Sequence, residues 1–198
     1  MRYLVLTIFM TAACTVSAPD APAGAPAVFP DALYLGVEDS GAKYAAPIAV
    51  QGGGPMAYSV ADVSIASASG DDQLLAVGAL HAGATQVVAK NALGQATIGV
   101  TVIAYSASAR MAGAQAWTKY NCAGCHDSGP DVTPSGIAKH TDAQLAGVVT
   151  MGQNPEGGEV SLGKSQHSFA IASSDPAYVG IAAYMRSLPA RGVPHADP

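Results

Sequence analysis

The chain has 198 residues, of which 49% are hydrophobic and 12% are charged, and its formal net charge is −5 at pH 7. This length is enough for two small domains. The acidic balance, together with a sequence that has no run of Lys and Arg, argues against nucleic acid as a partner. Beyond the first residues, no segment is long and apolar enough to span a membrane, which takes about 20 residues.

The amino terminus has the features of an export signal. Residues 3–13 form an uncharged, mostly apolar run that is too short to span a membrane but is typical of a signal peptide. The Thr-Ala-Ala-Cys at 11–14 resembles the lipobox of bacterial lipoproteins. We therefore expect residues 1–13 to be removed and Cys14 to carry lipid, with the membrane as a partner. The alternative is cleavage after Ala18, which would release a soluble periplasmic protein.

Two segments follow the signal peptide. Residues 14–27 are rich in Pro and Ala, which predicts an extended, partly stiff tether. From 28 to 105, short runs of β-branched and apolar residues are divided by turn residues, which predicts about seven short strands. The clearest strand is at 96–103, after a hairpin turn at 91–94. Strands at such spacing predict a β-sandwich.

Part of this region resembles bacterial Ig-like domains of the second group. The resemblance is carried by a Val-Ser-Ile-Ala-Ser strand at 63–67, a Leu-Ala-Val-Gly strand end at 75–78, and His-Ala-Gly-Ala-Thr-Gln-Val at 81–87. It covers roughly residues 28–104. It implies an all-β sandwich that acts as a spacer or a docking module.

The most informative stretch of the sequence is Cys-Ala-Gly-Cys-His at 122–126. This is the C-x-x-C-H motif of covalent haem attachment, in which two thiols bond the haem and the adjacent His ligates the iron. We therefore predict one covalent haem c on Cys122 and Cys125, with His126 as axial ligand. The alternatives are a thioredoxin-like pair or half of a zinc site. The sequence has no second cluster of zinc ligands, and its third cysteine is Cys14.

Residues 106–191 change to helical patterns. An Ala-rich stretch without Pro predicts a helix at 107–120, which leads into the haem motif. A further helix is predicted at 141–152, where Thr141 and Gln144 form a capping-box pattern. We expect helices to dominate this half of the chain.

These helical segments resemble class I cytochromes c. The resemblance is carried by Trp117 in the first helix, the C-x-x-C-H motif, and Gly-Ile-Ala-Ala-Tyr-Met-Arg-Ser-Leu-Pro at 180–189. It spans about residues 108–191 and implies an all-α fold in which Trp117 packs beside the haem. It also implies that Pro130 gives its backbone carbonyl to the axial His126.

The resemblance further implies a second axial ligand of the iron, usually a Met, at a point where this sequence has His167. We rank His167 first, Met151 second, and an open or water-bound site third. The plainest alternative for His167 is a solvated loop residue.

The sequence thus predicts an all-β Ig-like sandwich followed by an all-α class I cytochrome c fold. The expected segments are a signal peptide (1–13), a lipid-attachment Cys with tether (14–27), an Ig-like sandwich (28–105), a haem domain (106–191) and a tail (192–198).

The predicted function is single-electron transfer by an extracytoplasmic mono-haem c-type cytochrome. Its partner is an unidentified redox protein, and the chain is not expected to be an enzyme, whether it acts alone or as a subunit of an oxidoreductase complex. Two alternatives are open. One is a haem-based binder or sensor of small ligands, and the other is a surface adhesion or assembly module with an accessory haem. We expect the protein in the periplasm or at the cell surface.

Overall fold

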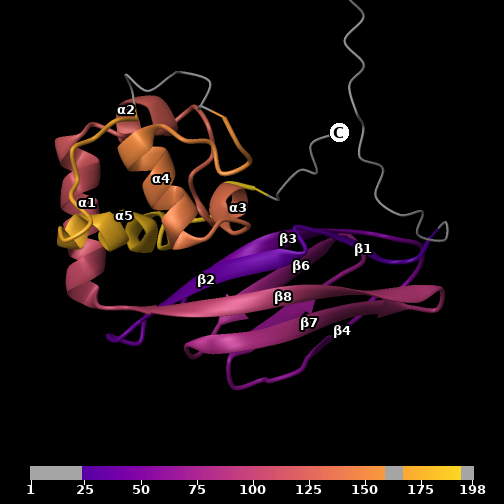
Figure 1. Cartoon of the computed structure of the whole chain (residues 1–198). Helices are drawn as coiled ribbons and strands as arrows, with labels where there is room; N and C mark the ends of the chain where they lie inside the picture. Colours follow the sequence, from indigo (N-terminus) through magenta and orange to yellow (C-terminus); the bar gives the residue numbers. More distant parts are fainter. Residues whose placement is uncertain (1–23, 159–166, 193–198) are drawn as a thin grey trace, which may run out of the picture.

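The computed structural model of the protein describes residues 24–158 and 167–192. Within them a two-layer β-sandwich has helices gathered at one end (Figure 1). The predicted signal peptide, the lipid site Cys14 and most of the tether lie outside the described residues, as do segment 159–166 and most of the tail.

Each layer of the sandwich is a four-stranded sheet. The first sheet is antiparallel, in the order β1 (Ala27–Phe29), β3 (Ala45–Gln51), β6 (Leu74–Ala79) and β5 (Ala66–Gly70). The second has the order β2 (Ala32–Glu38), β8 (Gly94–Tyr105), β7 (Gly83–Asn91) and β4 (Ala57–Val60). In this second sheet β2 runs parallel to β8, while the other neighbours are antiparallel. The predicted sandwich and its Ig-like character are confirmed.

Strand β8 shows why these residues form a sandwich. Ile98, Val100 and Val102 are buried in the core, while the residues between them are exposed or half-buried. This alternation is what a strand requires when one face of its sheet is covered. The β7–β8 hairpin turns at 91–94, where the Asn91 side-chain oxygen accepts hydrogen bonds from the backbone of Leu93 and Gly94.

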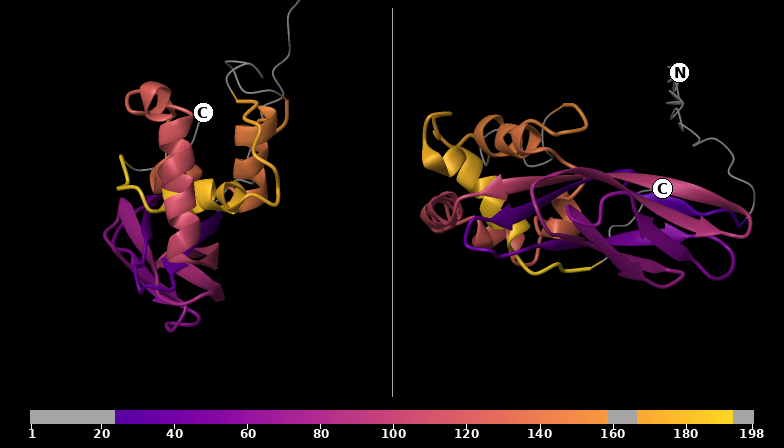
Figure 2. Two further views of the ribbon diagram at one scale, coloured as in Figure 1. Left: turned by 90° about the vertical axis from the view of Figure 1, so that its left-hand side faces the viewer. Right: turned by 90° about the horizontal axis from the view of Figure 1, so that it is seen from below.

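Five helices lie in the described part of the chain. They are α1 (Ala107–Lys119), α2 (Ala123–His126), α3 (Pro134–Ile137), α4 (Asp142–Met151) and α5 (Pro176–Arg186). Figure 2 shows α1 standing up from the sandwich with α5 lying across it. The crossing is close because a Cβ at Gly113 would lie 1.9 Å from the carbonyl oxygen of Gly180.

The helices are fastened to the outer strand β2. The backbone N–H of Tyr34 donates to the carbonyl of Ala138 at 2.7 Å, and the carbonyl of Tyr34 accepts from Arg186. Ala138 is buried in the same apolar cluster as the sandwich core. These contacts satisfy backbone groups of an edge strand that would otherwise be open to pairing with another chain.

A buried guanidinium joins the two parts of the molecule. Arg186 is only 2% exposed. It donates to the Tyr105 hydroxyl at 3.1 Å, to the Asp142 carboxylate at 2.9 Å and to the His140 carbonyl at 2.6 Å. A buried charge is tolerated only with such partners. Here they come from β8, from α4 and from the turn before α4.

The prediction of two domains, the second with an all-α class I cytochrome c fold, is wrong. The structure is one Ig-like sandwich with a few short helices, of which α2 and α3 have four residues each and α1, the longest described, has 13. The helices enclose a small apolar cluster of their own. They also share the sandwich core at Ala138 and its polar contacts at Arg186, so they do not form a separate body.

In the two described ranges, no helix combines the length and the apolar character needed to cross a bilayer.

Candidate functional site

The Cys-x-x-Cys-His segment lies on a single helical turn just beyond α1. Asn121 has a φ of 53°, in the left-handed region that Asn tolerates, and it turns the chain from α1 into α2. Its side chain packs against Gly124, where a Cβ would lie 2.7 Å from the Asn121 amide nitrogen. Cys122 is half-buried, Cys125 is exposed, and both thiols are free. A Cβ at position 124 would therefore require the Asn121 side chain to move.

His126 is oriented by the loop that follows it. Its Nδ1 lies 3.0 Å from the carbonyl oxygen of Pro130. The loop closes tightly, because a Cβ at Gly129 would lie 2.2 Å from the carbonyl oxygen of Cys125. A carbonyl accepts only from N–H, so Nδ1 carries the proton and Nε2 keeps a free lone pair. This is the tautomer that a metal-ligating His needs.

Aromatic side chains surround the His126 ring. The Trp117 ring from α1 lies 5.9 Å from it, centre to centre, and 5.6 Å from the ring of Tyr184 on α5. A second pair, Tyr120 and Phe169, has ring centres 4.7 Å apart. Trp117, Tyr120 and Phe169 all pack against the apolar cluster of the helices, and Trp117 is the one whose ring lies beside His126.

His167 lies next to His126, with 6.0 Å between the ring centres. Its Nδ1 is buried and has no hydrogen-bond partner within the part of the chain that the structure describes. Burial is the main cause that lowers the pKa of His167, and neighbouring His126 is the second. A lowered pKa favours the neutral ring, which can offer a lone pair.

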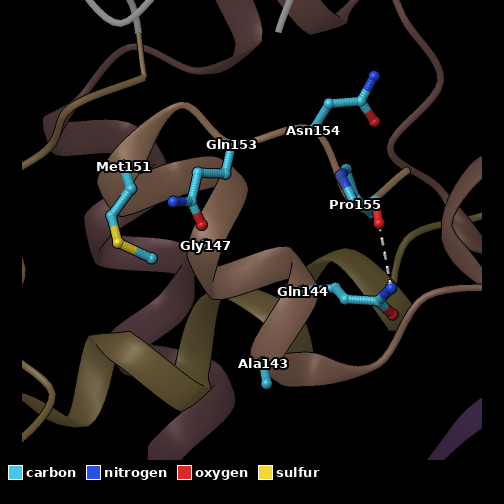
Figure 3. A pocket seen from close by; sticks show the side chains of 7 residues that line it. All are labelled: Ala143, Gln144, Gly147, Met151, Gln153, Asn154 and Pro155. Atoms are coloured by element: carbon cyan, nitrogen blue, oxygen red, sulfur yellow. Dashed lines mark hydrogen bonds between the residues drawn. The ribbon is translucent and has the colours of Figure 1, made fainter. Parts of the chain in front are cut away.

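Met151, the other predicted partner of the site, lies elsewhere. It is 47% exposed at the end of α4. Figure 3 shows it with Gly147 and Gln153 beside a hollow of about 280 Å³. Its methyl group lies 3.7 Å from where a Cβ on Gly147 would stand. Of the two candidate partners of His126, His167 is the one whose ring the structure brings beside it.

Cys122 does not resemble the activated thiol of a redox pair. Burial is the main cause that raises the pKa of the Cys122 thiol. Thioredoxin-like cysteines have lowered pKa values because the thiolate is the reactive form. The thiolate of Cys122 is instead disfavoured.

A conventional metal site is missing from the described ranges. There, no group of three or more His, Cys, Asp or Glu side chains could hold a metal ion. A structural zinc site, which takes four protein ligands, is thereby excluded from this part of the chain. A covalent haem is a different case, since it needs two thiols and an axial imidazole, so the haem attachment stays a prediction.

Sequence reasoning missed two buried charged residues. Arg186 ends the mostly apolar helix α5. A single charged residue in such a run was the sequence signal that could have indicated a buried, paired charge. Glu38, the last residue of β2, is only 4% exposed. It accepts hydrogen bonds from Tyr44 and Ser40 and pairs with Arg110 of α1 at 2.5 Å. Both residues tie helices to the sandwich and lie away from the cysteines.

Comparisons with known proteins find only distant likenesses. No protein-family model matches the sequence, and no curated protein matches it. Among solved structures, the I-band fragment I67–I69 from titin has 16% identity and a TM-score of 0.35, over 41% of this chain and 32% of the fragment. Titin M4 has 17% identity and a TM-score of 0.34, over 42% of this chain and 98% of the other.

A third similar structure is that of domains 4 and 5 of the S-layer protein SbsC. It has 15% identity and a TM-score of 0.32, over 39% of this chain and 50% of that two-domain fragment. This chain thus spans about a third of the titin fragment and half of the SbsC fragment that it matches. Likeness at this level does not extend to activity.

The predicted electron-transfer cytochrome, and the resemblance to class I cytochromes c behind it, are corrected by the fold. The described residues form one Ig-like sandwich with a few short helices, and no all-α cytochrome c domain is seen among them. The terms cytochrome c and electron transfer therefore are not supported for this chain.

Proposed function

We propose that this chain is an exported surface or assembly module, built on an Ig-like sandwich, that carries one covalent haem c as an accessory group and is not an enzyme. One observation supports the proposal most. Two free thiols and an imidazole with its Nδ1 already engaged stand on a single turn. That turn follows α1, which rises from the end of the sandwich (Figure 1).

The residues of this turn fit the group. Cys122 and Cys125 are the attachment points, and His126 has a free Nε2 because Pro130 holds its Nδ1. Trp117 contributes an aromatic surface beside the His126 ring. When bound, the haem supplies an iron atom that takes axial ligands. The chain's own contribution is to orient His126 and to provide apolar walls.

We also propose that Cys14 carries a lipid anchor, so that the bacterial membrane is a partner. The net charge of −5 argues against nucleic acid as a partner. The described chain begins at the end of the sandwich opposite the helices. There the Asn91 amide donates to the carbonyl of Gly24 at 2.7 Å. We call the turn at 122–126 the haem turn. A tether fixed at the opposite end of the sandwich leaves the haem turn on the side away from the anchor.

The haem attachment is tested on full-length protein produced in a bacterium with c-type haem maturation. The mature protein should gain the mass of one haem and keep its colour through acid-acetone extraction. Cys122→Ser together with Cys125→Ser should abolish both. If the mature wild-type protein is colourless and both thiols react with an alkylating reagent, the haem proposal is wrong.

The anchor is tested in the same strain. Labelled fatty acid should enter the wild type and not Cys14→Ser, which should leave the membrane fraction while retaining its haem. A wild-type protein recovered in soluble form, with its amino terminus at Pro19, would contradict the anchor without touching the haem. Protease added to intact cells then reports whether the module is at the cell surface.

A further inference from the structure

Three segments form part of the end of the sandwich that lies away from the helices (Figure 1). They are residues 24–26, 51–55 and 91–95, and together we call them the sandwich tip. These segments contain no charged residue. Leu93, in the turn between β7 and β8, is 56% exposed there. A single exposed Leu is ordinary on a protein surface, so its meaning depends on what lies beside it.

Asn91 links the three segments of the tip. Its side-chain amide donates to the carbonyl of Gly24 at 2.7 Å and to that of Gly53 at 2.9 Å. Its side-chain oxygen accepts from the backbone N–H of Leu93 at 2.8 Å. The backbone N–H of Gly53 donates to the same Gly24 carbonyl at 2.8 Å. Leu93 is therefore presented on a preorganised surface, which lowers the entropic cost of contact with a partner.

Leu93 lies where the described chain begins. A Cβ on Gly24 would stand 2.8 Å from a methyl carbon of Leu93. Nine residues, 15–23, separate Gly24 from Cys14. A fully extended chain spans at most about 3.6 Å per residue, so a lipid on Cys14 keeps the tip within roughly 35 Å of the bilayer. A tether this short gives the tip an effective concentration of about millimolar at the bilayer, at which even a weak contact forms.

We propose that the sandwich tip rests on the lipid bilayer and that Leu93 enters its interface. This inference rests on the lipid anchor of the proposed function and goes beyond it, because it assigns a second, non-covalent contact with the membrane. Asp71 and Asp72 lie in the β5–β6 turn at the same end of the sandwich, and together they outweigh the charge of the exposed Lys90 in β7. These carboxylates oppose attraction to anionic lipid. The contact therefore depends on burial of the apolar Leu93 side chain.

The test uses the mature lipidated protein on phosphatidylcholine vesicles and compares Leu93→Trp with Val63→Trp. Val63 is a matched control, because it is 72% exposed and lies in the loop between β4 and β5, at the helical end of the sandwich. Trp117 is the native Trp in both variants. Brominated acyl chains quench a Trp that they contact. They should dim the emission of Leu93→Trp and leave that of Val63→Trp unchanged.

Hydrogen exchange gives a second readout on the same vesicles. Backbone amides of residues 91–95 should exchange about tenfold more slowly in the anchored wild type than in Cys14→Ser, the factor that burial of one Leu side chain supports. Leu93→Asp should abolish this protection, whereas Val63→Asp should retain it.

The outcomes separate this inference from the anchor. A wild-type protein that takes no lipid and does not bind vesicles refutes the anchor. A lipidated protein on vesicles in which the Leu93→Trp emission is not quenched refutes the tip contact alone. Quenching of Val63→Trp instead would place the helical end on the bilayer. Protection of residues 91–95 on native membranes but not on vesicles would show that the tip binds a membrane protein and not lipid.

Discussion

Glu38 shows how a single buried carboxylate is kept charged. Burial alone would raise its pKa, but hydrogen bonds from Tyr44 and Ser40 and the charge of Arg110 outweigh burial and lower the pKa from 4.5. The same contact acts in the opposite direction on its partner. Burial, and then the hydrogen bond to Glu38, raises the pKa of Tyr44 to about 12. The ionised carboxylate is therefore part of the folded state.

This shift predicts how stability depends on pH. A group with a lowered folded pKa contributes stability that is complete above its unfolded pKa and is lost as the pH falls through the folded value. We expect wild-type stability to fall on acidification below about pH 4.5, and Glu38→Gln to show a weaker fall. At pH 7 that variant should lose about 2 kcal/mol. Denaturant unfolding at pH 7 and at a pH below 4.5 measures the free energy of unfolding of both proteins.

The matched control is Asp72→Asn, which removes an exposed carboxylate. Its stability should stay close to that of the wild type at pH 7. Equal acid sensitivity of Glu38→Gln and the wild type would show that another carboxylate controls the transition.

At the scale of elements, the crossing of α1 and α5 depends on two glycines. A Cβ at Gly113 would lie 1.9 Å from the Gly180 carbonyl oxygen, and one at Gly180 would lie 2.3 Å from the Ala109 carbonyl oxygen. In both cases the obstacle is backbone, which cannot rotate away. The two helices would have to separate.

We therefore predict that Gly113→Ala lowers the free energy of unfolding by about 1–3 kcal/mol, the usual cost of overpacking. Gly147→Ala in α4 is the control, since its Cβ meets nothing closer than 3.7 Å. Because Ala is the better helix former by about 1 kcal/mol, that variant should be neutral or slightly stabilising. Thermal and denaturant unfolding distinguish them, and equal effects would contradict the close crossing.

Elements with local signals could be predicted from the sequence. The capping box that opens α4 is present, with Thr141 and Gln144 hydrogen-bonded to each other's backbone, and Gly152 ends the helix at a φ of 63°. The β7–β8 hairpin likewise depends on Asn91 and its neighbours. Each of these features is decided within a few residues, so the pattern alone contains the information.

Contacts between distant segments could not be predicted. Nothing local tells that Arg186 donates to the carbonyl of Tyr34, or that Ala138 enters the sandwich core. The motif identified His126, but position along the chain left both His167 and Met151 as candidates for the side chain beside it. A two-domain description failed for the same reason, since the fastening of the helices to β2 is a long-range event.

At the scale of the whole molecule, the hydrogen bonds of Arg186 join the helices to the sandwich. Its planar fork reaches Tyr105, Asp142 and two backbone carbonyls at once. Lysine keeps the charge but has a single nitrogen and cannot hold this set.

Arg186→Lys should therefore lower the free energy of unfolding by about 3 kcal/mol and speed hydrogen exchange in β2 and α4. Arg191→Lys, at an exposed position, is the control. Exchange measured by mass spectrometry locates the change. Protection of β2 and α4 that is unchanged in Arg186→Lys would show that the buried guanidinium does not join the two parts.

If Cys14 carries a lipid, the joining of helices and sandwich sets where the turn at 122–126 would stand relative to a membrane. The described part of the chain starts beside the β7–β8 turn, where Gly94 lies close to Ala25, and β8 then runs 12 residues to the helices. At about 3.3 Å per residue, this strand separates the two ends by roughly 35–40 Å. A lipid on Cys14 would therefore hold the tether end near the bilayer and the helical end away from it.

Two exposed apolar residues mark the two ends and can each carry a spin label on an introduced cysteine. Leu93 lies in the β7–β8 turn and Val179 on α5. On vesicles with a paramagnetic chelate lipid, we expect stronger relaxation of the label in Leu93→Cys than in Val179→Cys, since the tether end lies nearer the surface. Added Cys14→Ser should abolish both effects. Equal relaxation at the two positions would mean that the sandwich lies flat on the membrane and does not raise the haem turn above it.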